Sequence, residues 1–320
     1  MSSGVRGARS LGRCGISVTA LGLGCAPLGN LFDAVSDVNA QATVDAAWDA
    51  GIRLFDTAPL YGNGLSERRL GAALAQRPRN EFVLSTKVGR LLREPPPGTS
   101  LDTIFADAPQ RDPVFAYSRD DVLRSIDESL TRLGLDRIDI VYVHDPDNHE
   151  EEALTGAFPT LIELRDQGVI GAVGCGMNQW QMLDRFVTRV DLDCVLLAGR
   201  YSLLDRSGAE VLLPHCAERG VGVVLGGVFN SGLLADPDRN ATYDYVRAPE
   251  VLIERARAMA RACAANGTPL VAAALQFALR HPAVTAVVVG ARSAPEVQVD
   301  VSAATAAIPE PLWAELDALV

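Results

Sequence analysis

The sequence predicts an α/β protein built as a single (β/α)8 TIM barrel, and three observations support this fold class. Eight short apolar segments recur along the 320 residues, each followed by a longer stretch of helical periodicity. Such strand–helix alternation implies parallel pairing through crossovers. Several segments are rich in Val, Ile and Leu with little polar alternation, which is typical of strands buried on both faces. Eight such units within roughly 250 residues match the size of a closed barrel, and a doubly wound open sheet is the alternative architecture.

The expected strands are residues 18–24, 52–56, 82–87, 139–144, 170–176, 194–201, 221–226 and 284–290. The helices between them have recognisable ends. Ser118 is followed three residues later by Asp121, which predicts a helix start, and Gly134 is expected to end that helix in a left-handed conformation. Other helices are expected to end at a glycine directly before a strand (Gly51, Gly168 and Gly220). A weak hairpin pattern before residue 20 is expected to cover the bottom of the barrel.

Two stretches interrupt this rhythm. Residues 90–117 are too long for an ordinary connection and contain Pro95-Pro96-Pro97-Gly98, and residues 230–248 are polar. Connections of this length are usually functional or disordered. We expect residues 90–117 to form a long loop at the face of the barrel that carries the site. Because no linker composition occurs, we expect residues 1–320 to form one domain.

Composition excludes several kinds of partner. The chain has 40 acidic and 29 basic residues, and the basic residues form no block that would neutralise a nucleic-acid backbone. No apolar run reaches the roughly 18 residues of a membrane helix. The first ten residues lack the apolar core of a signal peptide, so we expect a cytoplasmic protein. The six cysteines and four histidines are scattered without paired spacing, which favours reduced thiols and predicts no metal site.

Four ionisable residues follow three successive strands. Asp56 and Tyr61 come after the second strand, Lys87 ends the third, and His144 ends the fourth. In these barrels, catalytic residues come from the C-terminal ends of several strands. Taken singly, Asp56 is compatible with a turn, Tyr61 with a half-buried rim position and His144 with a core position. Lys87 is harder to explain structurally, because unpaired lysine is rarely placed inside a barrel.

The chemistry of these residue types explains why they occur together. A tyrosine has an ordinary pKa of about 10, too high for ready proton exchange at neutral pH. A nearby ammonium stabilises the phenolate, and a carboxylate holds that ammonium in place. We therefore predict that Asp56 and Lys87 tune Tyr61 as a general acid/base, while His144 binds and orients the substrate oxygen.

The motif Asp56-Thr-Ala-Pro-Leu-Tyr61-Gly, together with Lys87-Val-Gly and His144-Asp, resembles the catalytic tetrad of the aldo-keto reductase family. The resemblance covers nearly the whole chain. It implies a (β/α)8 fold, with Tyr61 as proton donor or acceptor and Lys87 and Asp56 as its relay. It also implies that NAD or NADP binds extended across the barrel mouth. This agrees with the lack of a dinucleotide-binding glycine motif after the first strand.

Four segments resemble one branch of the family, the D-threo-aldose (L-fucose) dehydrogenases and pyridoxal 4-dehydrogenases: residues 47–51, 62–67, 198–204 and 227–232. This implies oxidation of an aldose such as L-fucose or D-arabinose at the anomeric carbon, giving a lactone. The alternatives are a pyridoxal dehydrogenase, a general aldehyde reductase, and a non-catalytic regulatory barrel that binds the nicotinamide. The expected partner is a small sugar or aldehyde, and the chain is compatible with a monomer or a homodimer.

The resemblance also assigns cofactor contacts. Asn178 matches the residue that holds the nicotinamide carboxamide, although it is equally suited to begin the helix that follows. The loop after the seventh strand matches the segment that covers the pyrophosphate (Ser231, Gly232 and Leu233). The segment after the eighth strand matches the adenosine-binding segment and contains four candidate contacts (Gly290, Arg292, Glu296 and Asp300).

Three positions depart from the family pattern. Ala198 replaces a common glutamine, and Gly226 replaces an aromatic ring that stacks on the nicotinamide. Glu296 stands near an arginine that often pairs with the 2′-phosphate of NADP, so we expect NAD in preference to NADP. Arg292 is a counterargument, because it can reach that phosphate. Arg200 is compatible with a substrate or cofactor contact and equally with a salt bridge to a neighbouring carboxylate.

Overall fold

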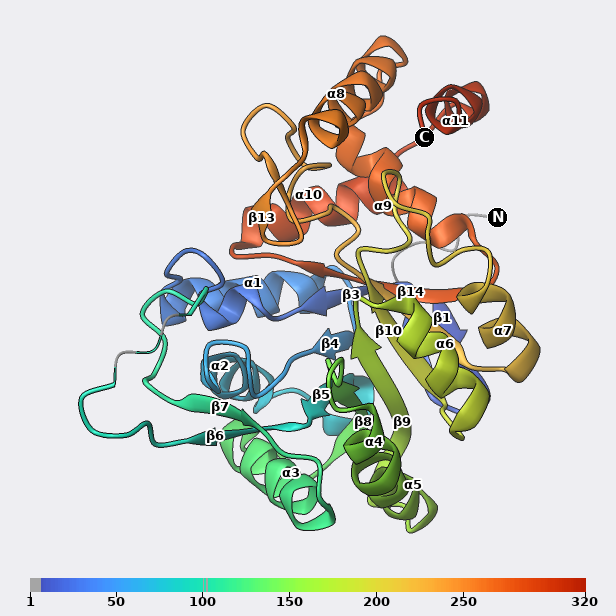
Figure 1. The fold of residues 1–320 in the computed structure, drawn as a ribbon. Helices are drawn as coiled ribbons and strands as arrows, with labels where there is room; N and C mark the ends of the chain where they lie inside the picture. Colours follow the sequence, from blue (N-terminus) through green and yellow to red (C-terminus); the bar gives the residue numbers. More distant parts are fainter. Residues whose placement is uncertain (1–6, 100, 102) are drawn as a thin grey trace.

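The computed structural model describes residues 7–99, 101 and 103–320 (Figure 1). Eight parallel strands close into a barrel, which confirms the predicted fold and rules out the open sheet. In their order around the barrel, the strands are β3 (Leu21–Gly24), β4 (Leu54–Asp56), β5 (Val83–Val88), β8 (Ile138–His144), β9 (Ile170–Met177), β10 (Cys194–Ala198), β11 (Gly222–Gly226) and β14 (Val284–Gly290). Each of these strands lies within or overlaps one of the eight expected segments.

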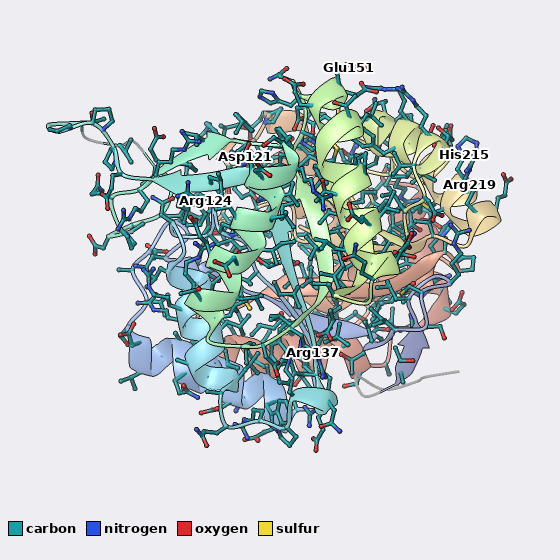
Figure 2. All side chains as sticks on the ribbon, turned by 90° about the horizontal axis from the view of Figure 1, so that it is seen from below. Asp121, Arg124, Arg137, Glu151, His215 and Arg219 are labelled. Atoms are coloured by element: carbon teal, nitrogen blue, oxygen red, sulfur yellow. The ribbon has the colours of Figure 1, made fainter. Side chains whose placement is uncertain are left out.

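Helices surround the barrel and turn charged side chains outward, as Arg124, Glu151 and Arg219 illustrate in Figure 2. The helices are α1 (Asp37–Asp49), α2 (Leu65–Leu74), α3 (Arg119–Leu133), α4 (Glu150–Glu152), α5 (Phe158–Asp166), α6 (Trp180–Arg189), α7 (Leu212–Arg219), α8 (Glu250–Ala265), α9 (Leu270–Arg280), α10 (Ala294–Thr305) and α11 (Glu310–Asp317). Two short 3-10 helices, η1 (Pro27–Gly29) and η2 (Arg79–Glu81), and one π-helix, η3 (Ala153–Ala157), complete them. The expected ends of α3 are confirmed: the Ser118 hydroxyl accepts from the Asp121 N–H, and Gly134 has φ 63°.

The barrel interior is filled by side chains and is closed at its N-terminal end. Leu54, Tyr142 and Val288 belong to one buried cluster inside the barrel, and the cluster extends to Leu11 and Val18. Those two residues belong to the segment that forms an antiparallel hairpin of β1 (Ala8–Ser10) and β2 (Ser17–Thr19). The expected hairpin is therefore present and closes the bottom of the barrel. The expected strand 18–24 is in fact two strands, because residues 18–19 pair within this hairpin.

Two excursions leave the barrel at the C-terminal ends of strands. The segment expected as a long loop contains a hairpin stem, β6 (Arg90–Arg93) paired with β7 (Asp112–Phe115). The segment after β11 contains a second hairpin, β12 (Thr242–Tyr243) and β13 (Val246–Arg247). Figure 1 shows β6, β7 and β13 on the left side of the barrel, together with the turn that leads into α1. The two hairpins therefore stand over the same mouth.

Across the described ranges, no single helix is long and apolar enough to cross a bilayer. Helices α8 and α9 reach that length and composition only together, and they meet at a bend of 100°. Both helices bury residues in the core of this barrel, including Met259 and Leu275.

Candidate active site

The barrel register brings three of the predicted catalytic residues to one rim. Asp56 pairs with Ser85 between β4 and β5, Lys87 pairs with Tyr142 between β5 and β8, and His144 ends β8. Parallel strands place their C-terminal ends at the same edge, so side chains distant in sequence meet there. Tyr61 joins them from the turns between β4 and α2.

Lys87 is buried, with 1% of its surface exposed, and its ammonium donates two hydrogen bonds. Lys87 Nζ donates to Asp56 Oδ2 at 2.7 Å and to the carbonyl of Thr57 at 2.9 Å. The other Asp56 oxygen accepts from the Ser85 hydroxyl at 2.7 Å. Burial is the largest influence on Lys87 and opposes its charged form, but Asp56 and Tyr61 together outweigh burial and raise the pKa of the ammonium above its ordinary value. Lys87 therefore stays charged throughout the neutral pH range.

The ring of Tyr61 lies over this ion pair. Lys87 Nζ is 4.6 Å from the centre of the Tyr61 ring, and the His144 ring meets it edge-on at 5.8 Å between centroids. Burial raises the pKa of the Tyr61 phenol; Lys87 lowers it, and Asp56 raises it again. The net direction is upward, opposite to the expected tuning, because burial outweighs the attraction of the ammonium. Tyr61 therefore carries its proton at neutral pH.

His144 is a neutral imidazole in this arrangement. Burial lowers its pKa well below the ordinary value, and the positive charges of Lys87 and Arg90 lower it further. His144 Nε2 lies 3.5 Å from Asp145 Oδ2. A neutral imidazole can donate one hydrogen bond to a substrate oxygen without adding charge to the site.

Asp145 is a site residue that the sequence interpretation missed. Burial raises the pKa of its carboxyl to about 6, whereas Arg90, whose guanidinium lies 3.4 Å away, lowers it. Its backbone is left-handed, with φ 40°, directly after the strand end. The signal available in the sequence was its position beside His144, at the end of a predicted strand.

A buried carboxylate supports β5 from behind. Glu67, on α2, is fully buried and accepts from the Thr86 hydroxyl at 2.7 Å and from Arg132 Nε at 2.5 Å. Thr86 precedes Lys87, so this network holds the strand that presents the ammonium. The sequence signal was a charged residue between buried positions of a helix, Ser66 and Leu70, which our interpretation did not use.

The nicotinamide end of the predicted cofactor site lies at β9, β10 and β11. The side chain of Asn178 does not begin α6, whose N-cap is Gln179; its amide instead donates to the carbonyl of Ala198 at 3.0 Å. Two glycines leave space beside this side chain. A Cβ added to Gly199 would lie 3.9 Å from the amide of Asn178, and one added to Gly226 would lie 3.4 Å from Leu196. An asparagine amide can both donate and accept hydrogen bonds, and next to glycine backbone it fits the carboxamide of a planar nicotinamide ring.

The predicted pyrophosphate loop adopts left-handed backbone at Ser231 and Gly232. The N–H of Gly232 bonds to Phe229 and that of Leu233 bonds to Asn230, so both are used within the turn. Leu233 is buried. The Ser231 hydroxyl accepts from the N–H of Tyr245, which ties this loop to the β12–β13 hairpin.

The predicted adenosine segment is divided by the structure. Arg292 pairs with Asp33 and lies 3.6 Å from Glu296, whose carboxylate also accepts from the Arg292 N–H at 2.8 Å. Gly290 ends β14 and is exposed. Asp300, one turn further along α10 (Ala294–Thr305) than Glu296, is instead turned inward: it is 9% exposed and faces the barrel wall at Leu21, Leu23 and Ile52. Burial and the nearby Glu296 raise the pKa of the Asp300 carboxyl to about 7.

Arg200 forms a salt bridge with a neighbouring carboxylate, which was one of the two roles expected for it. Its guanidinium contacts both oxygens of Asp244, at 3.0 and 2.5 Å, and lies 3.2 Å from the hydroxyl of Tyr243. Asp244 and Tyr243 belong to the β12–β13 hairpin, so Arg200 fastens this hairpin to the rim of β10.

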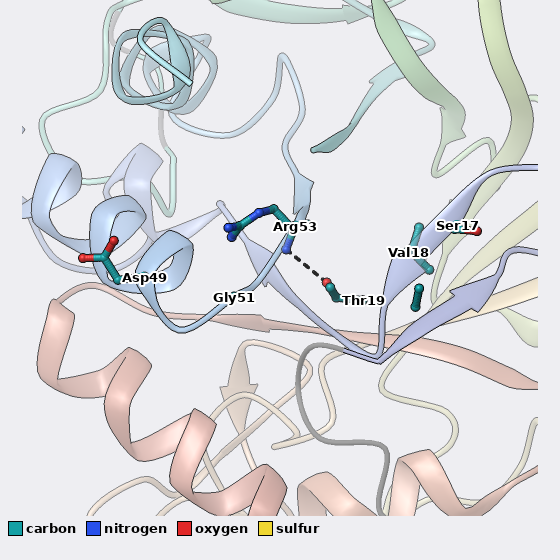
Figure 3. Close-up of a pocket in the computed structure, with 7 residues that line it drawn as sticks. Ser17, Val18, Thr19, Asp49, Gly51 and Arg53 are labelled. Atoms are coloured by element: carbon teal, nitrogen blue, oxygen red, sulfur yellow. Dashed lines mark hydrogen bonds between the residues drawn. The ribbon is translucent and has the colours of Figure 1, made fainter. Parts of the chain in front are cut away.

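A hollow of about 400 Å³ lies at the opposite, N-terminal end of the barrel. Its lining includes Thr19 and Arg53, and the N–H of Arg53 donates to the Thr19 hydroxyl at 3.1 Å (Figure 3). None of the four predicted catalytic residues lines it. Active sites of these barrels lie at the C-terminal face, so this hollow is not the candidate site.

All six cysteines are free thiols, and five of them are buried. Within the residues that the structure describes, no group of three or more His, Cys, Asp or Glu side chains is arranged to hold a metal ion.

Comparison with known proteins decides the family. The aldo/keto reductase family model matches residues 20–320. The chain belongs to this family. It is 46% identical to D-threo-aldose 1-dehydrogenase from Pseudomonas sp. over 94% of both chains, and 44% identical to pyridoxal 4-dehydrogenase from Microbacterium luteolum over 96% of both. The holo form of an aldo-keto reductase from Bacillus halodurans has a similar fold, with a TM-score of 0.77, 27% identity and coverage of 98% of this chain and 96% of that one.

This aldo-keto reductase is therefore an NAD(P)-dependent oxidoreductase, and the predicted family, fold and enzyme class are confirmed. The relatives from Pseudomonas and Microbacterium carry the names of dehydrogenases, so they do not support a non-catalytic regulatory barrel.

Proposed function

We propose that this aldo-keto reductase oxidises the cyclic form of an aldose, of the L-fucose or D-arabinose type, at the anomeric carbon and produces the lactone. The observation that carries the reaction type is the buried Asp56–Lys87 pair beneath the ring of Tyr61, with neutral His144 beside it. The substrate class is supported by the 46% identity to D-threo-aldose 1-dehydrogenase over nearly the full chain.

In this proposal Tyr61 takes the proton of the anomeric hydroxyl as its oxygen becomes the carbonyl oxygen of the lactone. His144 donates a hydrogen bond to the same oxygen and orients it. Lys87, held by Asp56 and by the Thr57 carbonyl, stabilises the phenolate needed for proton removal. When bound, the nicotinamide supplies the hydride acceptor for the anomeric C–H, and Asn178 would hold its carboxamide.

We propose further that NAD is preferred to NADP. Arg292 is already shared between two carboxylates, Asp33 and Glu296, so this corner carries net negative charge. The 2′-phosphate of NADP would add negative charge there, which costs affinity. A carboxylate can instead accept hydrogen bonds from the ribose hydroxyls of NAD.

The test is a panel of aldoses, pyridoxal and simple aldehydes assayed with each cofactor at the absorbance of the reduced nicotinamide. We expect L-fucose and D-arabinose with NAD to have the highest kcat/KM. A tenfold or greater preference for pyridoxal would establish the second candidate, which the 44% identical pyridoxal 4-dehydrogenase supports. Cofactor binding without turnover of any compound would contradict the proposal.

A further inference from the structure

Five aromatic rings, here called the ring arc, follow one another around the barrel mouth: His144, Tyr61, Phe105, Phe32 and Tyr245. The Tyr61 ring lies 6.4 Å from that of Phe105, and the Phe32 ring lies 6.0 Å from that of Tyr245, both between centroids. Phe105 and Phe32 are linked through the backbone of their segments, because the Phe32 N–H donates to the carbonyl of Ile104 at 2.9 Å.

The members of the ring arc come from separate excursions. Phe32 follows β3, Phe105 belongs to the β6–β7 excursion, and Tyr245 is in the β12–β13 hairpin. The far end is open to solvent: Phe32 is 49% exposed and Tyr245 52% exposed. Exposed rings that gather at the mouth of a site mark a surface that a ligand covers.

Tyr245 occupies a backbone position that favours glycine. The hairpin pairs Tyr243 with Val246, so Asp244 and Tyr245 form its two-residue turn, with φ 50° and 66°. Such turns strongly prefer Asn-Gly or Asp-Gly, because both residues have positive φ. Phe32 is also left-handed, with φ 64°. Bulky residues persist in this conformation where function requires the side chain.

The charged groups of the site act on the phenol of Tyr245, although about half of this residue is exposed. Partial burial raises the pKa of the phenol, Asp145 and Asp244 raise it further, and Lys87 lowers it. Arg200 keeps the turn in place through its two contacts with Asp244. The strained turn is thus anchored by a charged, two-pronged interaction.

We propose that Phe32 and Tyr245 form the outer wall of the substrate pocket and pack against the face of a six-membered ring, and that Arg200 positions Tyr245 for this contact. The inference rests on the proposed function for the sugar but commits only to a ring-shaped substrate. An aromatic face suits the C–H surface of a pyranose or a planar pyridine, whereas a three-carbon aldehyde has no ring face to offer for such a contact.

The test compares Phe32→Gly and Tyr245→Gly with the wild type. Glycine adopts both backbones without strain, so both variants are expected to fold. We expect each to raise KM for L-fucose by about 3- to 10-fold, the usual size of an aromatic contact, with kcat within about twofold. KM for glyceraldehyde and the Kd of the cofactor should stay unchanged. Val246→Ala, an exposed neighbour on the same hairpin, is the matched control and should change none of these values.

Arg200 is tested by a double-mutant cycle. If it acts through Tyr245, Arg200→Ala should raise KM for L-fucose in the same direction, and combining it with Tyr245→Gly should add little. Tyr245→Phe keeps the aromatic ring that Tyr245→Gly removes, so its KM for L-fucose should be close to the wild-type value. The proposed outer wall would be contradicted by equal changes in KM for L-fucose and glyceraldehyde, by an unchanged KM for both, or by weaker binding of the cofactor.

The same variants are also assayed with benzaldehyde and reduced cofactor, which separates this inference from the proposed function. If the wild type oxidises no aldose, the proposed function fails. The proposed outer wall is still supported if the glycine variants raise KM for benzaldehyde and not for glyceraldehyde. It is contradicted if they do not.

Discussion

Lys87 shows at the scale of one residue how chemistry overrides stability. Taking an ammonium and a carboxylate out of water costs several kcal/mol for each ion, and a buried pair often stabilises less than apolar residues of the same volume. Lys87 and Asp56 recover part of that cost through the Ser85 hydroxyl and the Thr57 carbonyl. A fully buried pair against a tyrosine ring at a barrel mouth is therefore better explained by function than by folding.

Tyr61→Phe is expected to lower kcat by a factor on the order of 10² or more, because it removes the hydroxyl that we propose to transfer the proton and little else. The Kd of the cofactor, measured by fluorescence titration, should change little. Since the pKa of the Tyr61 phenol is raised, the phenolate is scarce at neutral pH. The rate of oxidation by the wild type should therefore rise with pH from 6 to 9.

That rise should be absent from the residual activity of Tyr61→Phe. Near-normal turnover by this variant would show that another group moves the proton.

At the scale of elements, the excursion of residues 90–117 is more ordered than a loop. Its stem is the β6–β7 hairpin, and its far part contacts the mouth where Asn63 Nδ2 donates to the carbonyl of Pro109 at 2.9 Å. Long connections at the catalytic face of a barrel commonly set specificity while the barrel positions the chemistry. We propose that this excursion is a wall or lid for the substrate.

Replacing residues 94–111 by a two-residue Asn-Gly turn is expected to raise KM for aldoses. It should also reduce the difference in kcat/KM between one aldose and another. The β6–β7 stem can close with such a turn, because Arg93 pairs with Asp112. Cofactor Kd should be unchanged, and Pro96→Ala, an exposed change within the same excursion, should have no effect. Unaltered selectivity in a folded, shortened variant would give this excursion another role.

Glu296, in the first turn of α10, and Arg292 just before this helix carry charges that we propose to influence cofactor choice. Glu296→Arg replaces the carboxylate that holds Arg292 and is expected to shift the kcat/KM ratio of NADP to NAD toward NADP by roughly tenfold or more. Glu310→Arg, the same charge change at the start of α11, is the control and should leave the ratio as it is. A ratio unmoved by Glu296→Arg would show that this residue does not face the ribose.

At the scale of the whole molecule, Asp300 links folding stability to pH. The pKa of its carboxyl is about 7 in the folded chain and near 4 in an unfolded one, so ionisation favours unfolding. The folded state is penalised increasingly as pH rises from about 4 to about 7, and fully above that range. Removing the charge should therefore help most at alkaline pH.

We compare the free energy of unfolding of Asp300→Asn with that of the wild type. The difference is expected to be about 2–3 kcal/mol more favourable to the variant at pH 8 than at pH 5. The measurement is urea unfolding of the variant and the wild type at both pH values. Asp127→Asn, an exposed change on α3, should show no such pH dependence. An equal difference at both pH values would mean that Asp300 is ionised in the folded chain.

Features that depend on local pattern could be predicted from the amino-acid sequence. The eight strands follow from apolar runs and the ends of α3 from Ser118 and Gly134, because strand burial and helix capping involve neighbours in the chain. The meeting of Asp56, Lys87 and His144 was also predictable, since parallel strands of a barrel end at one rim whatever the details of packing.

Features that depend on opposing energies or on residues distant in the chain could be seen only in the folded structure. The pKa of Tyr61 rises because burial outweighs Lys87, and burial is not written in a motif. Asn178 binds the neighbouring strand at Ala198 instead of beginning α6. Arg200 finds Asp244, 44 residues away, and so holds Tyr245 at the mouth. Such contacts are set by where the barrel places each excursion, which no local pattern specifies.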